Sequence, residues 1–552
     1  MRRKFKALLI AIPLVLFSLF SSSYVDSYFE ISKNLDIFIT LFKELNLYYV
    51  DETQPGDLVE EGIGGMLKSL DPYTTYIPET DIEDYRFMTT GQYGGIGALI
   101  RKKDDHVVVA EPYVDFPAYK AGLLAGDVIL EVNGKSTNEK STSDISKVLK
   151  GQPQTEVKML IKRFGVEEPF EKTIVREEIK IKSVPYSGML DDETGYVNLS
   201  SFTDNCTKDV KDALVDLKAE GMKKLVLDLR GNPGGLLKEA VSLSNLFVSK
   251  GELIVSTKGK VKEWNKNYTA TEPAWDKEMP LVVLVNSGSA SASEIVSGII
   301  QDLDRGVVIG QRTFGKGLVQ TTRPLSYNSQ LKVTTAKYYI PSGRCIQALD
   351  YSNRNEDGSV GKVPDSLITR YHTRAGRPVY DGGGVNPDVE VEPTQLSDIA
   401  FNLGMKMLYF DFATEFKHEN EAIEAIDEFR IGDELYSKFN TWLDEKEFDY
   451  ETRSEKMLES LKKEAEEEKY FDRIETEYDA LENKVKHDKT HDMEVFRDEV
   501  ADLLRGEIIS RYYHQHGRVE AMLEQDRDVE KAIEILTNPV EYNRIITEVA
   551  QD

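Results

Sequence analysis

The spacing of hydrophobic and polar residues divides the first third of the chain into two regions. Residues 31–50, ISKNLDIFITLFKELNLYYV, carry apolar positions at helical spacing, and LDPYTTYIP at residues 70–78 then introduces a turn. Between about residues 90 and 165, short β-rich runs such as HVVVAEPY alternate with the turn signals GLLAGD and VNGK. We therefore expect an N-terminal helical region over residues 28–88 and a small domain of mixed α+β structure over residues 89–168.

The next region alternates buried-type strands with amphipathic helices. The runs LVLDLR and PLVVLVN have the continuous hydrophobicity of strands that are covered on both faces, whereas VKDALVDLKAEG and LLKEAVSLSNLF have helical spacing. Further strands are expected at residues 307–309 and 331–340, and the glycine- and proline-rich GGGVNPDVEVEP at residues 382–393 closes the region. The alternation predicts an α/β core over residues 178–395.

The composition changes after about residue 396. Residues 451–480 hold 11 acidic and 6 basic side chains. An apolar stripe at helical spacing follows Tyr470, Ile474, Tyr478, Leu481 and Val485, which is typical of core or of a partner-facing surface. We expect an acidic helical region over residues 396–552 that carries no catalytic group and packs on the core, mediates assembly as a homo-oligomer or binds an adaptor.

The first residues resemble an export signal. A basic Met1–Lys4 precedes an uncharged apolar run from Ala7 to Phe20, and small residues follow at Ser21–Ser23. This pattern predicts a secretory signal over residues 1–23; an uncleaved N-terminal membrane anchor is the alternative. In either case we expect an exported protein, periplasmic or attached to the outer face of the cytoplasmic membrane.

Overall composition narrows the classes of partner. The 552 residues carry a net charge of −27 with a pI near 4.9, which disfavours nucleic acid or anionic lipid as the main partner. The two cysteines, Cys206 and Cys345, cannot build a disulfide framework, and we expect two buried or unpaired thiols.

The stretch NSGSASASEIVSGIIQDL, residues 286–303, places four serines between an expected strand and an expected helix. A serine there lies at a helix N-terminus, where free amides and the helix dipole favour developing negative charge. The same residues also suit N-cap and turn positions, so the run by itself does not identify a nucleophile. The four serines are Ser287, Ser289, Ser291 and Ser293.

A nucleophilic serine needs a base, and the histidines of this chain are poorly placed for that role. Of seven, only His372 falls within the α/β region, so a histidine triad has little support. Lys316 is the better candidate: Gly315 and Gly317 flank it, the apolar residues nearby can desolvate its amine, and Gln320 follows four residues later.

Two competing chemistries lack their essential groups. The segment GQRTFGKG, residues 310–317, nearly matches a phosphate-binding loop, but its position for the magnesium-binding hydroxyl is Gly317, and a β-like run follows instead of a helix. No HExxH motif is present, and His487 and His491 lie on a charged helix. We therefore expect neither a metal nor another cofactor.

Together these motifs resemble the carboxyl-terminal processing peptidases, or tail-specific proteases, which are serine peptidases with a serine–lysine dyad and a PDZ domain. The resemblance covers roughly residues 33–395 and rests on LDPYTTY, GGIGALI, GLLAGDVILEVNG, LDLRGNPGG, GSASASEI, TFGKGLVQ, YYIPSGRCIQ and GVNPDVEVEP in this order. It implies that Ser291 is the nucleophile, Lys316 the general base and Gln320 the residue that orients the base. It also implies a crotonase-like or ClpP-like α/β core with an inserted PDZ domain.

The resemblance assigns two further groups of residues. In LDLRGNPGG, the amide of Gly235, with Gly234 as a possible substitute, would form an oxyanion hole together with the amide of Ala292. In GGIGALI, the amides of Ile96, Gly97 and Ala98 would cradle a terminal carboxylate while the peptide adds as a strand. The segment FPAYKAGLLAGD would supply the turn and helix that flank this groove.

The expected function is that of an exported serine endopeptidase that binds C-terminal tails of exported or unfolded proteins and cleaves them through an acyl-enzyme. A non-catalytic PDZ scaffold that only binds protein C-termini is the alternative. A hydrolase of small esters or amides is a second alternative, which the PDZ-like module disfavours because such substrates need no receptor for a peptide tail.

Overall fold

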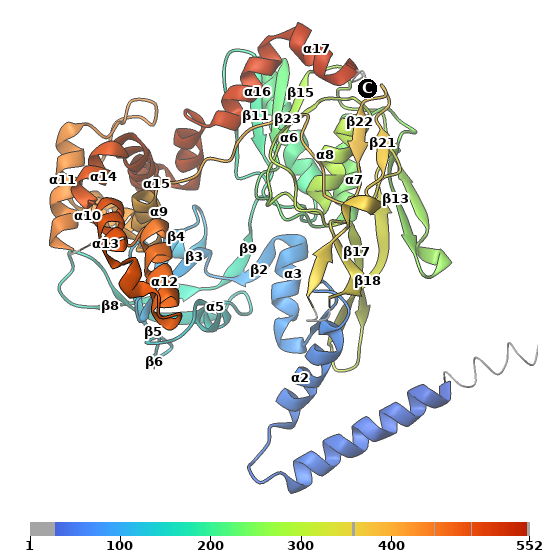
Figure 1. The fold of residues 1–552 in the computed structure, drawn as a ribbon, viewed down its shortest axis with the longest axis horizontal. Coiled ribbons are helices and arrows are strands. Elements are labelled where there is room, and N and C mark those ends of the chain that lie inside the picture. The colour runs from blue at the N-terminus through green and yellow to red at the C-terminus, as the bar shows by residue number, and fades with distance from the viewer. Residues whose placement is uncertain (1–27, 356–358, 447, 487, 549–552) are drawn as a thin grey trace, which may run out of the picture.

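The computed structural model describes residues 28–355, 359–446, 448–486 and 488–548 (Figure 1). The expected export signal lies outside these residues. Among the helices that can be described, none is both long and apolar enough to cross a lipid bilayer. Neither cysteine is in a disulfide: Cys206 is buried and Cys345 half-buried, which confirms the expectation of unpaired thiols.

The α/β core is built on a six-stranded sheet with the order β10-β11-β12-β15-β16-β23. All neighbouring strands are parallel except for the antiparallel pair β10–β11. The bounds are Tyr186–Met189, Thr194–Asn198, Lys224–Asp228, Leu281–Val285, Val307–Gly310 and Val389–Glu390. The prediction of an α/β core from alternating strands and helices is confirmed, and the sheet proves to be mainly parallel.

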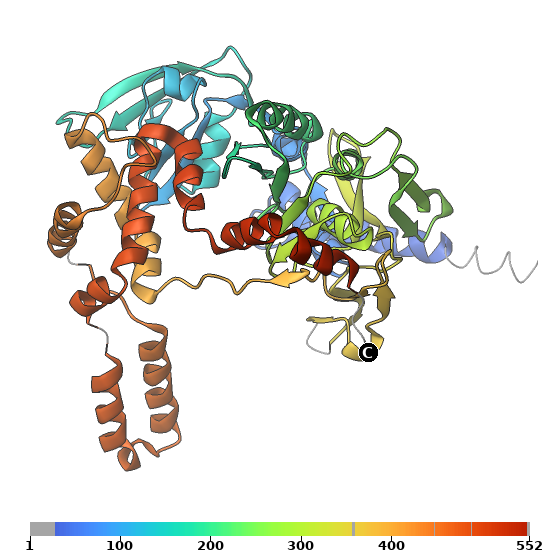
Figure 2. The same ribbon diagram turned by 90° about the horizontal axis from the view of Figure 1, so that it is seen from above.

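Both faces of this sheet are covered by helices. On one face lie α6 (Cys206–Glu220), α7 (Leu237–Asn245) and α8 (Ala292–Asp302), which share the largest hydrophobic cluster with the strands. On the other face lie two helices from the end of the chain, α16 (Arg527–Thr537) and α17 (Pro539–Thr547). Figures 1 and 2 show these red helices against the green core. The tail therefore completes the core.

A second sheet stands beside the first and carries the segment that follows Lys316. Its order is β1-β18-β13-β14, with β17 paired to β18. The bounds are Thr75–Ile77, Gln330–Tyr339, Leu253–Gly259, Lys266–Thr269 and Leu318–Pro324. Two small hairpins follow, β19–β20 (Leu349–Arg354 and Val360–Lys362) and β21–β22 (Arg370–His372 and Pro378–Tyr380).

The small domain is a sheet of order β3-β4-β5-β7-β8, with β6 paired to β5. The strands are Ala98–Lys103, His106–Pro112, Val128–Val132, Glu156–Lys162, Phe170–Val175 and Lys135–Ser136. Strand β3 is at the edge, and the helix that packs beside it is α5 (Thr142–Leu149). The helix in FPAYKAGLLAGD is α4 (Pro117–Lys120), which packs on β8, and its Ala118 N–H donates to the Ile96 carbonyl at 2.7 Å, so this segment lies against the predicted carboxylate loop.

The segment before this domain is mainly helical, as expected. A helix covers residues 28–48, followed by α2 (Pro55–Lys68) and α3 (Ile82–Thr90), and the short strand β1 interrupts them. The pair β2 (Gln92–Gly95) and β9 (Glu177–Lys180) then forms the entry to and exit from the small domain. In Figure 1 the first helix extends away from the rest of the protein.

Residues 398–523 form a helical domain that packs against the small domain. Its core gathers aromatic and aliphatic side chains of several helices. Lys103 of β3 pairs with Asp411 at 2.6 Å, and Phe410 packs on Val108 and Ala110. The helices α9 to α15 are Asp398–Met405, Leu408–Glu419, Asp433–Glu445, Arg453–Glu467, Glu475–Val485, Lys489–Val495 and Arg497–Leu523, the last of them kinked at His514.

The expected continuous stripe from Tyr470 to Val485 is interrupted. Helix α12 ends at Glu467, Lys469 adopts a positive φ of 60°, and α13 begins at Glu475. Tyr470 precedes the 3₁₀ helix Phe471–Arg473, and Ile474 is the N-cap of α13 with a non-helical φ of −123°, so these two residues do not continue the apolar face of α13. Tyr478 is buried whereas Tyr470 is exposed.

We expect Ile535→Ala to destabilise the core by about 2–5 kcal/mol, because Ile535 is buried between α16 and the strands of the core sheet. Guanidinium unfolding followed by tryptophan fluorescence measures the change. Glu534→Ala, on the exposed side of the same helix, is the matched control. Equal stability of the two variants would contradict the placement of α16 in the core.

Candidate active site

Three loops of the core meet at one edge of the parallel sheet. The segments after β12, β15 and β16 carry LRGNPGG, NSGSAS and QRTFGKG respectively. Since neighbouring parallel strands point the same way, their carboxyl ends lie together, which is where open α/β sheets place their sites. The topology thus brings together motifs that are up to 90 residues apart in sequence.

Ser291 is the N-cap residue of α8 and has unusual backbone angles. Its φ is 55° and its ψ is −107°, a conformation that a residue with a Cβ rarely adopts. Such strain costs on the order of 1–3 kcal/mol and persists only when the surroundings hold it. The Ser291 N–H donates to Oε2 of Glu294 at 2.8 Å, and the Ser291 carbonyl accepts from the Tyr338 hydroxyl at 3.1 Å.

The neighbouring serines have structural roles. The Ser289 hydroxyl donates to the Leu229 carbonyl at 2.8 Å, and the Ser293 hydroxyl donates to the Asn232 carbonyl at 2.9 Å; both side chains are fully buried. The Ser291 hydroxyl, in contrast, faces a cavity, and within the described chain no acceptor is recorded for its proton. Of these three serines, only Ser291 presents its hydroxyl for chemistry.

A buried carboxylate joins the serine segment to the lysine segment. Glu294 is fully buried, and its Oε1 accepts from the Thr313 hydroxyl at 2.6 Å and from the Gly315 N–H at 2.7 Å. Its Oε2 accepts from the backbone N–H of both Ser291, at 2.8 Å, and Lys316, at 2.9 Å. Burial raises the pKa of Glu294, and these hydrogen bonds oppose that shift. The Glu294 carboxylate therefore fixes both backbone segments in one arrangement.

Lys316 lies in surroundings that disfavour its charged form. Its Nζ is 4.4 Å from the centroid of the Tyr73 ring, and the side chain is largely enclosed. Burial, with a smaller contribution from the charge of Lys332, lowers the pKa of Lys316 to about 8 against the opposing effect of Glu294 and Asp71. A substantial fraction of the amine is therefore neutral near pH 8 and able to accept a proton.

Ser291, Lys316 and Gln320 line one cavity of about 530 Å³, together with Lys332 and Tyr338. Gln320 does not bond to Lys316 here: its Nε2 donates to the Thr334 hydroxyl at 3.1 Å. Among the described residues, no hydrogen bond between the Ser291 hydroxyl and the Lys316 amine is recorded. Apart from Lys182, Lys316, Gln320 and Lys332, most of the described cavity wall consists of aromatic, apolar and small side chains, among them residues of α3, α7, α8 and β17.

The glycine-rich turn after β12 reaches the same cavity. Gly234 lies so close to Ser291 that a Cβ at Gly234 would come within 2.8 Å of the Ser291 Cβ. The Gly234 N–H is already bonded to Oδ1 of Asn232 at 2.9 Å. In the part of the chain that the structure describes, no acceptor is recorded for the backbone N–H of Gly235 or Ala292, both of which line the cavity. Gly235 is thus better placed than Gly234 to donate to a bound oxyanion.

The tail helices support this turn through charge. Arg230 bonds to Asp228 of β12 at 2.6 Å and also to Asp526 at 2.7 Å and Asp528 at 2.9 Å, which lie at the start of α16. Arg230 begins the turn that contains Gly234 and Gly235. The acidic tail thus holds the base of the glycine-rich turn, although no described residue of the tail lines the cavity.

In the small domain, the predicted carboxylate loop lies between β2 and β3. Gly97 has a φ of +72°, and a Cβ there would come within 2.5 Å of Phe116, so only glycine fits. The carbonyls of Ile96 and Gly97 accept from Ala118 and Tyr113; the Gly97 N–H faces the Tyr93 hydroxyl, and for the Ile96 N–H no partner is recorded within the described structure. Ala98 begins the edge strand β3, beside α5.

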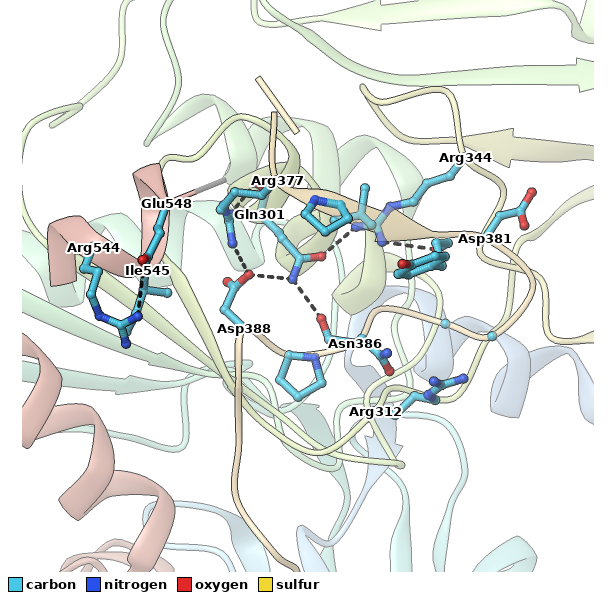
Figure 3. Close-up of a pocket in the computed structure, with 16 residues that line it drawn as sticks. Gln301, Arg312, Arg344, Arg377, Asp381, Asn386, Asp388, Arg544, Ile545 and Glu548 are labelled. Atoms are coloured by element: carbon cyan, nitrogen blue, oxygen red, sulfur yellow. Dashed lines mark hydrogen bonds and ion pairs between the residues drawn. The ribbon is translucent and has the colours of Figure 1, made fainter. Parts of the chain in front are cut away.

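A larger cavity of about 800 Å³ lies elsewhere, near the end of α8 and beside α17 (Figure 3). Its charged lining residues pair mainly with one another or with nearby carboxylates: Arg377 with Asp388 at 2.5 Å, and Arg344 with Asp302 at 2.9 Å. Figure 3 shows Gln301 bridging the same network. Neither the serine nor the lysine motif reaches it, so we assign it no catalytic role.

His372 is exposed in β21 and does not line the cavity, so the preference for lysine over histidine agrees with the structure.

The sequence patterns missed several residues of the site. Glu294, Tyr338 and Lys332 were not singled out, although each contacts or surrounds the catalytic segments. Only the position of Glu294, three residues after Ser291 as in a capping box, carried a local signal.

Comparison with known proteins finds family matches for three regions of the chain. Residues 193–353 match peptidase family S41, residues 108–163 match the PDZ domain, and residues 399–536 match the C-terminal helical domain of probable PDZ-proteases. A carboxy-terminal-processing protease of Bartonella bacilliformis is 40% identical over 321 residues, covering 57% of this chain and 73% of that protein.

Two further proteins are similar. A probable CtpA-like serine protease of Staphylococcus aureus is 34% identical over 441 residues, covering 78% of this chain and 85% of the relative. The photosystem II D1 C-terminal processing protease is a solved structure with 29% identity and a TM-score of 0.35, covering 64% of this chain and 86% of that one.

The chain therefore belongs to peptidase family S41. Within it, the chain is one of the carboxy-terminal-processing proteases, a serine-type peptidase with a PDZ domain and a C-terminal helical domain.

Replacing Lys332 by Met should raise the pKa of Lys316 by roughly half a unit or more, because one positive charge beside a partly buried amine is removed. Competitive acetylation followed by mass spectrometry measures the pKa of Lys316. Lys332→Arg keeps the charge and is the matched control. The same pKa in the Met and Arg variants would show that Lys332 does not act on Lys316.

Proposed function

We propose that the protein is an exported serine endopeptidase in which Ser291 is the nucleophile and Lys316 the general base. The observation that carries the proposal is the shared carboxylate of Glu294, which holds the backbone of both residues at the wall of one cavity. A lysine with a lowered pKa beside a serine whose hydroxyl has no other recorded acceptor is the arrangement that this chemistry needs.

In the first step, neutral Lys316 takes the proton of the Ser291 hydroxyl while the serine oxygen attacks the carbonyl carbon of the substrate. The negative charge moves to the carbonyl oxygen, where the N–H groups of Gly235 and Ala292 receive it. The N-terminus of α8 adds a favourable dipole at the same point. Collapse of this intermediate breaks the peptide bond, and the Lys316 ammonium gives its proton to the leaving amine.

In the second step, water replaces the amine. Lys316, neutral again, takes a proton from the water, whose oxygen attacks the acyl carbon of the Ser291 ester. The intermediate collapses with return of that proton to the serine oxygen, which releases the new carboxyl group and restores the enzyme. Gln320 orients the amine when the side chain of Lys316 turns from the Tyr73 ring toward Ser291; such hydrogen bonds often tighten only in the substrate complex.

The PDZ domain would select the substrate by its C-terminus. The Ile96 N–H, without a recorded partner among the described residues, suits a carboxylate, which could also replace the Tyr93 hydroxyl at the Gly97 N–H, and the edge of β3 beside α5 suits an added strand. Export through the N-terminal segment, with periplasmic or membrane-attached location, and a crotonase-like or ClpP-like origin of the core belong to the same proposal.

The dyad predicts different outcomes for similar substitutions. Ser291→Ala should lower the cleavage of an unfolded protein by at least about 10⁴-fold, whereas Ser289→Ala should act mainly through stability. Lys316→Arg should be nearly as inactive as Lys316→Ala, because arginine stays protonated and cannot take the serine proton. Fragment yields by mass spectrometry measure each variant. Turnover by Lys316→Arg above about one tenth of the native rate would exclude Lys316 as the base.

Recognition of the free C-terminus predicts that amidation weakens binding. A charge-assisted hydrogen bond is worth about 1.5–3 kcal/mol, so the affinity of an amidated peptide should fall about 10- to 100-fold. Fluorescence anisotropy with Ser291→Ala protein measures binding without cleavage. Gly97→Val should have the same effect as amidation, since a Cβ at Gly97 meets Phe116. Equal affinities for free and amidated peptides would mean that the PDZ domain does not recognise the carboxylate.

A further inference from the structure

The cavity beside Ser291 and Lys316 contains a second lysine that takes no part in the proposed proton transfers. Lys332 of β18 lines this cavity and is half-buried. Among the described residues no ion pair or hydrogen bond is recorded for its amine, and burial lowers its pKa. A partly desolvated ammonium without a counter-ion is unfavourable, so this position suits an anionic group that arrives with a ligand.

The two carboxylates that influence Lys316 are bonded to groups other than Lys332. Asp71 accepts from the N–H and the hydroxyl of Thr74 at 2.8 and 3.0 Å, and from the Thr334 hydroxyl at 3.2 Å. The second carboxylate, that of Glu294, accepts from the two catalytic loops. The described wall of the cavity holds three lysines and no carboxylate. In a protein with a net charge of −27, this wall is a local positive region that attracts negatively charged groups.

Strand pairing brings Lys332 close to the catalytic lysine. Lys316 Nζ is 4.4 Å from the centroid of the Tyr73 ring, and Thr75, two residues further along the chain, pairs with Lys332. Strand β17, which begins just after Lys316, runs antiparallel to β18 and places Thr322 opposite Lys332 (Figure 1). Lys332 therefore lies beside the catalytic lysine and faces the same cavity.

The leaving half of a substrate passes this part of the wall. In the proposed mechanism Lys316 gives its proton to the leaving amine, so that nitrogen lies beside Lys316 and the residues after the cleaved bond continue from there. An extended chain advances by about 3.3–3.6 Å per residue, so a group two or three residues after the bond lies about 7–10 Å from it. The long, flexible side chain of Lys332 can reach a group at that distance.

We propose that Lys332 binds a carboxylate of the substrate on the leaving side, and that the protease therefore prefers a negative charge two or three residues after the cleaved bond. This role presupposes the dyad of Ser291 and Lys316 proposed above. The carboxylate belongs to an Asp or Glu side chain at that position, or to the terminus of a tail of two or three residues. Both sources present the same group to the ammonium.

Cleavage of matched peptides by the native protein tests the preference without any substitution. Amidated peptides with about eight residues after the cleaved bond would carry Asp or Asn at each leaving-side position in turn, and mass spectrometry identifies the bond. Asp at the second or third position should raise kcat/KM at least about 10-fold over Asn, the value of a charge-assisted hydrogen bond. Equal kcat/KM for Asp and Asn at every position would overturn the proposal for acidic side chains.

A second set of peptides tests the terminal carboxylate as the source. Tails of two or three residues are compared with free and amidated ends, in the native protein and in Lys332→Met. The free end should be preferred at least about 10-fold by the native protein, and this preference should shrink in Lys332→Met. The PDZ domain is the same in both proteins, so its own recognition of the free end does not account for the difference. The same preference in both proteins would exclude the terminal carboxylate as a ligand of Lys332.

Variants of the cavity lysines assign the preference to one residue. The ratio of kcat/KM for the Asp and Asn peptides should fall to about one in Lys332→Met and stay high in Lys332→Arg, which keeps the charge. A changed pKa of Lys316 affects both peptides and does not by itself alter the ratio. Lys182→Met removes another charge from the same cavity and is the matched control. Equal losses in Lys182→Met and Lys332→Met would mean that no single lysine holds the carboxylate, contrary to the proposal.

Ser291→Ala separates this role of Lys332 from the proposed function. That variant should cleave none of the peptides at a measurable rate. Cleavage that persists in Ser291→Ala would contradict the dyad, and the role of Lys332 would fall with it. Cleavage that requires Ser291 but does not distinguish carboxylate from amide in either set of peptides would leave the dyad in place and overturn only the role of Lys332.

Discussion

The active site depends on the burial of one carboxylate. Taking Glu294 out of water costs several kcal/mol, and only hydrogen bonds to its oxygens offset that cost. The four donors that surround it come from two loops: Ser291 N–H from one, and the Thr313 hydroxyl, Gly315 N–H and Lys316 N–H from the other. If either loop moved away, the buried carboxylate would lose some of its hydrogen-bond donors. The carboxylate therefore holds the two loops together. The positive φ of Ser291 is maintained by the same bonds.

This constraint explains features that would otherwise look unrelated. Gly315 has a φ of +87°, and a Cβ added there would lie 2.4 Å from the Ala348 side chain. Only glycine therefore allows the N–H of this residue to approach Glu294. Thr313 both donates to Glu294 and accepts from the Val385 N–H, which ties the far end of the core to the site. On the opposite side, Asp526 and Asp528 hold Arg230 beneath the glycine-rich turn. The acidic tail is thus part of the scaffold of the site, without touching the cavity.

The sequence predicted the parts of the site that depend on residues close together in the chain, and it missed the parts that depend on contacts between distant residues. Local periodicity predicted the buried strands and the helices of the α/β core, and short motifs located Ser291, Lys316 and the glycine-rich turn, because each of those signals lies within a few residues. Lys332 and Tyr338 belong to β18, and they reach the site through strand pairing with β17 that no local pattern reveals. The packing of α16 on the core sheet was equally out of reach, since its apolar face does not specify which surface it covers. The prediction of a continuous stripe from Tyr470 failed for a local reason: the 3₁₀ helix Phe471–Arg473 separates Tyr470 from α13, which begins only at Glu475.

The electrostatics of the cavity follow from the same carboxylate. Glu294 and Asp71 favour the ammonium form of Lys316, so the fold has to counter them if the amine is to act as a base. Burial of the amine and the positive charge of Lys332 both lower the pKa of Lys316 and thereby counter the two carboxylates. In a protein of net charge −27, the described wall of this cavity carries Lys182, Lys316 and Lys332 and no carboxylate. Glu294 therefore fixes the geometry of the two loops by accepting hydrogen bonds from their N–H groups, and those donors stabilise its negative charge. Lys316 keeps a pKa near the pH range in which a peptidase works.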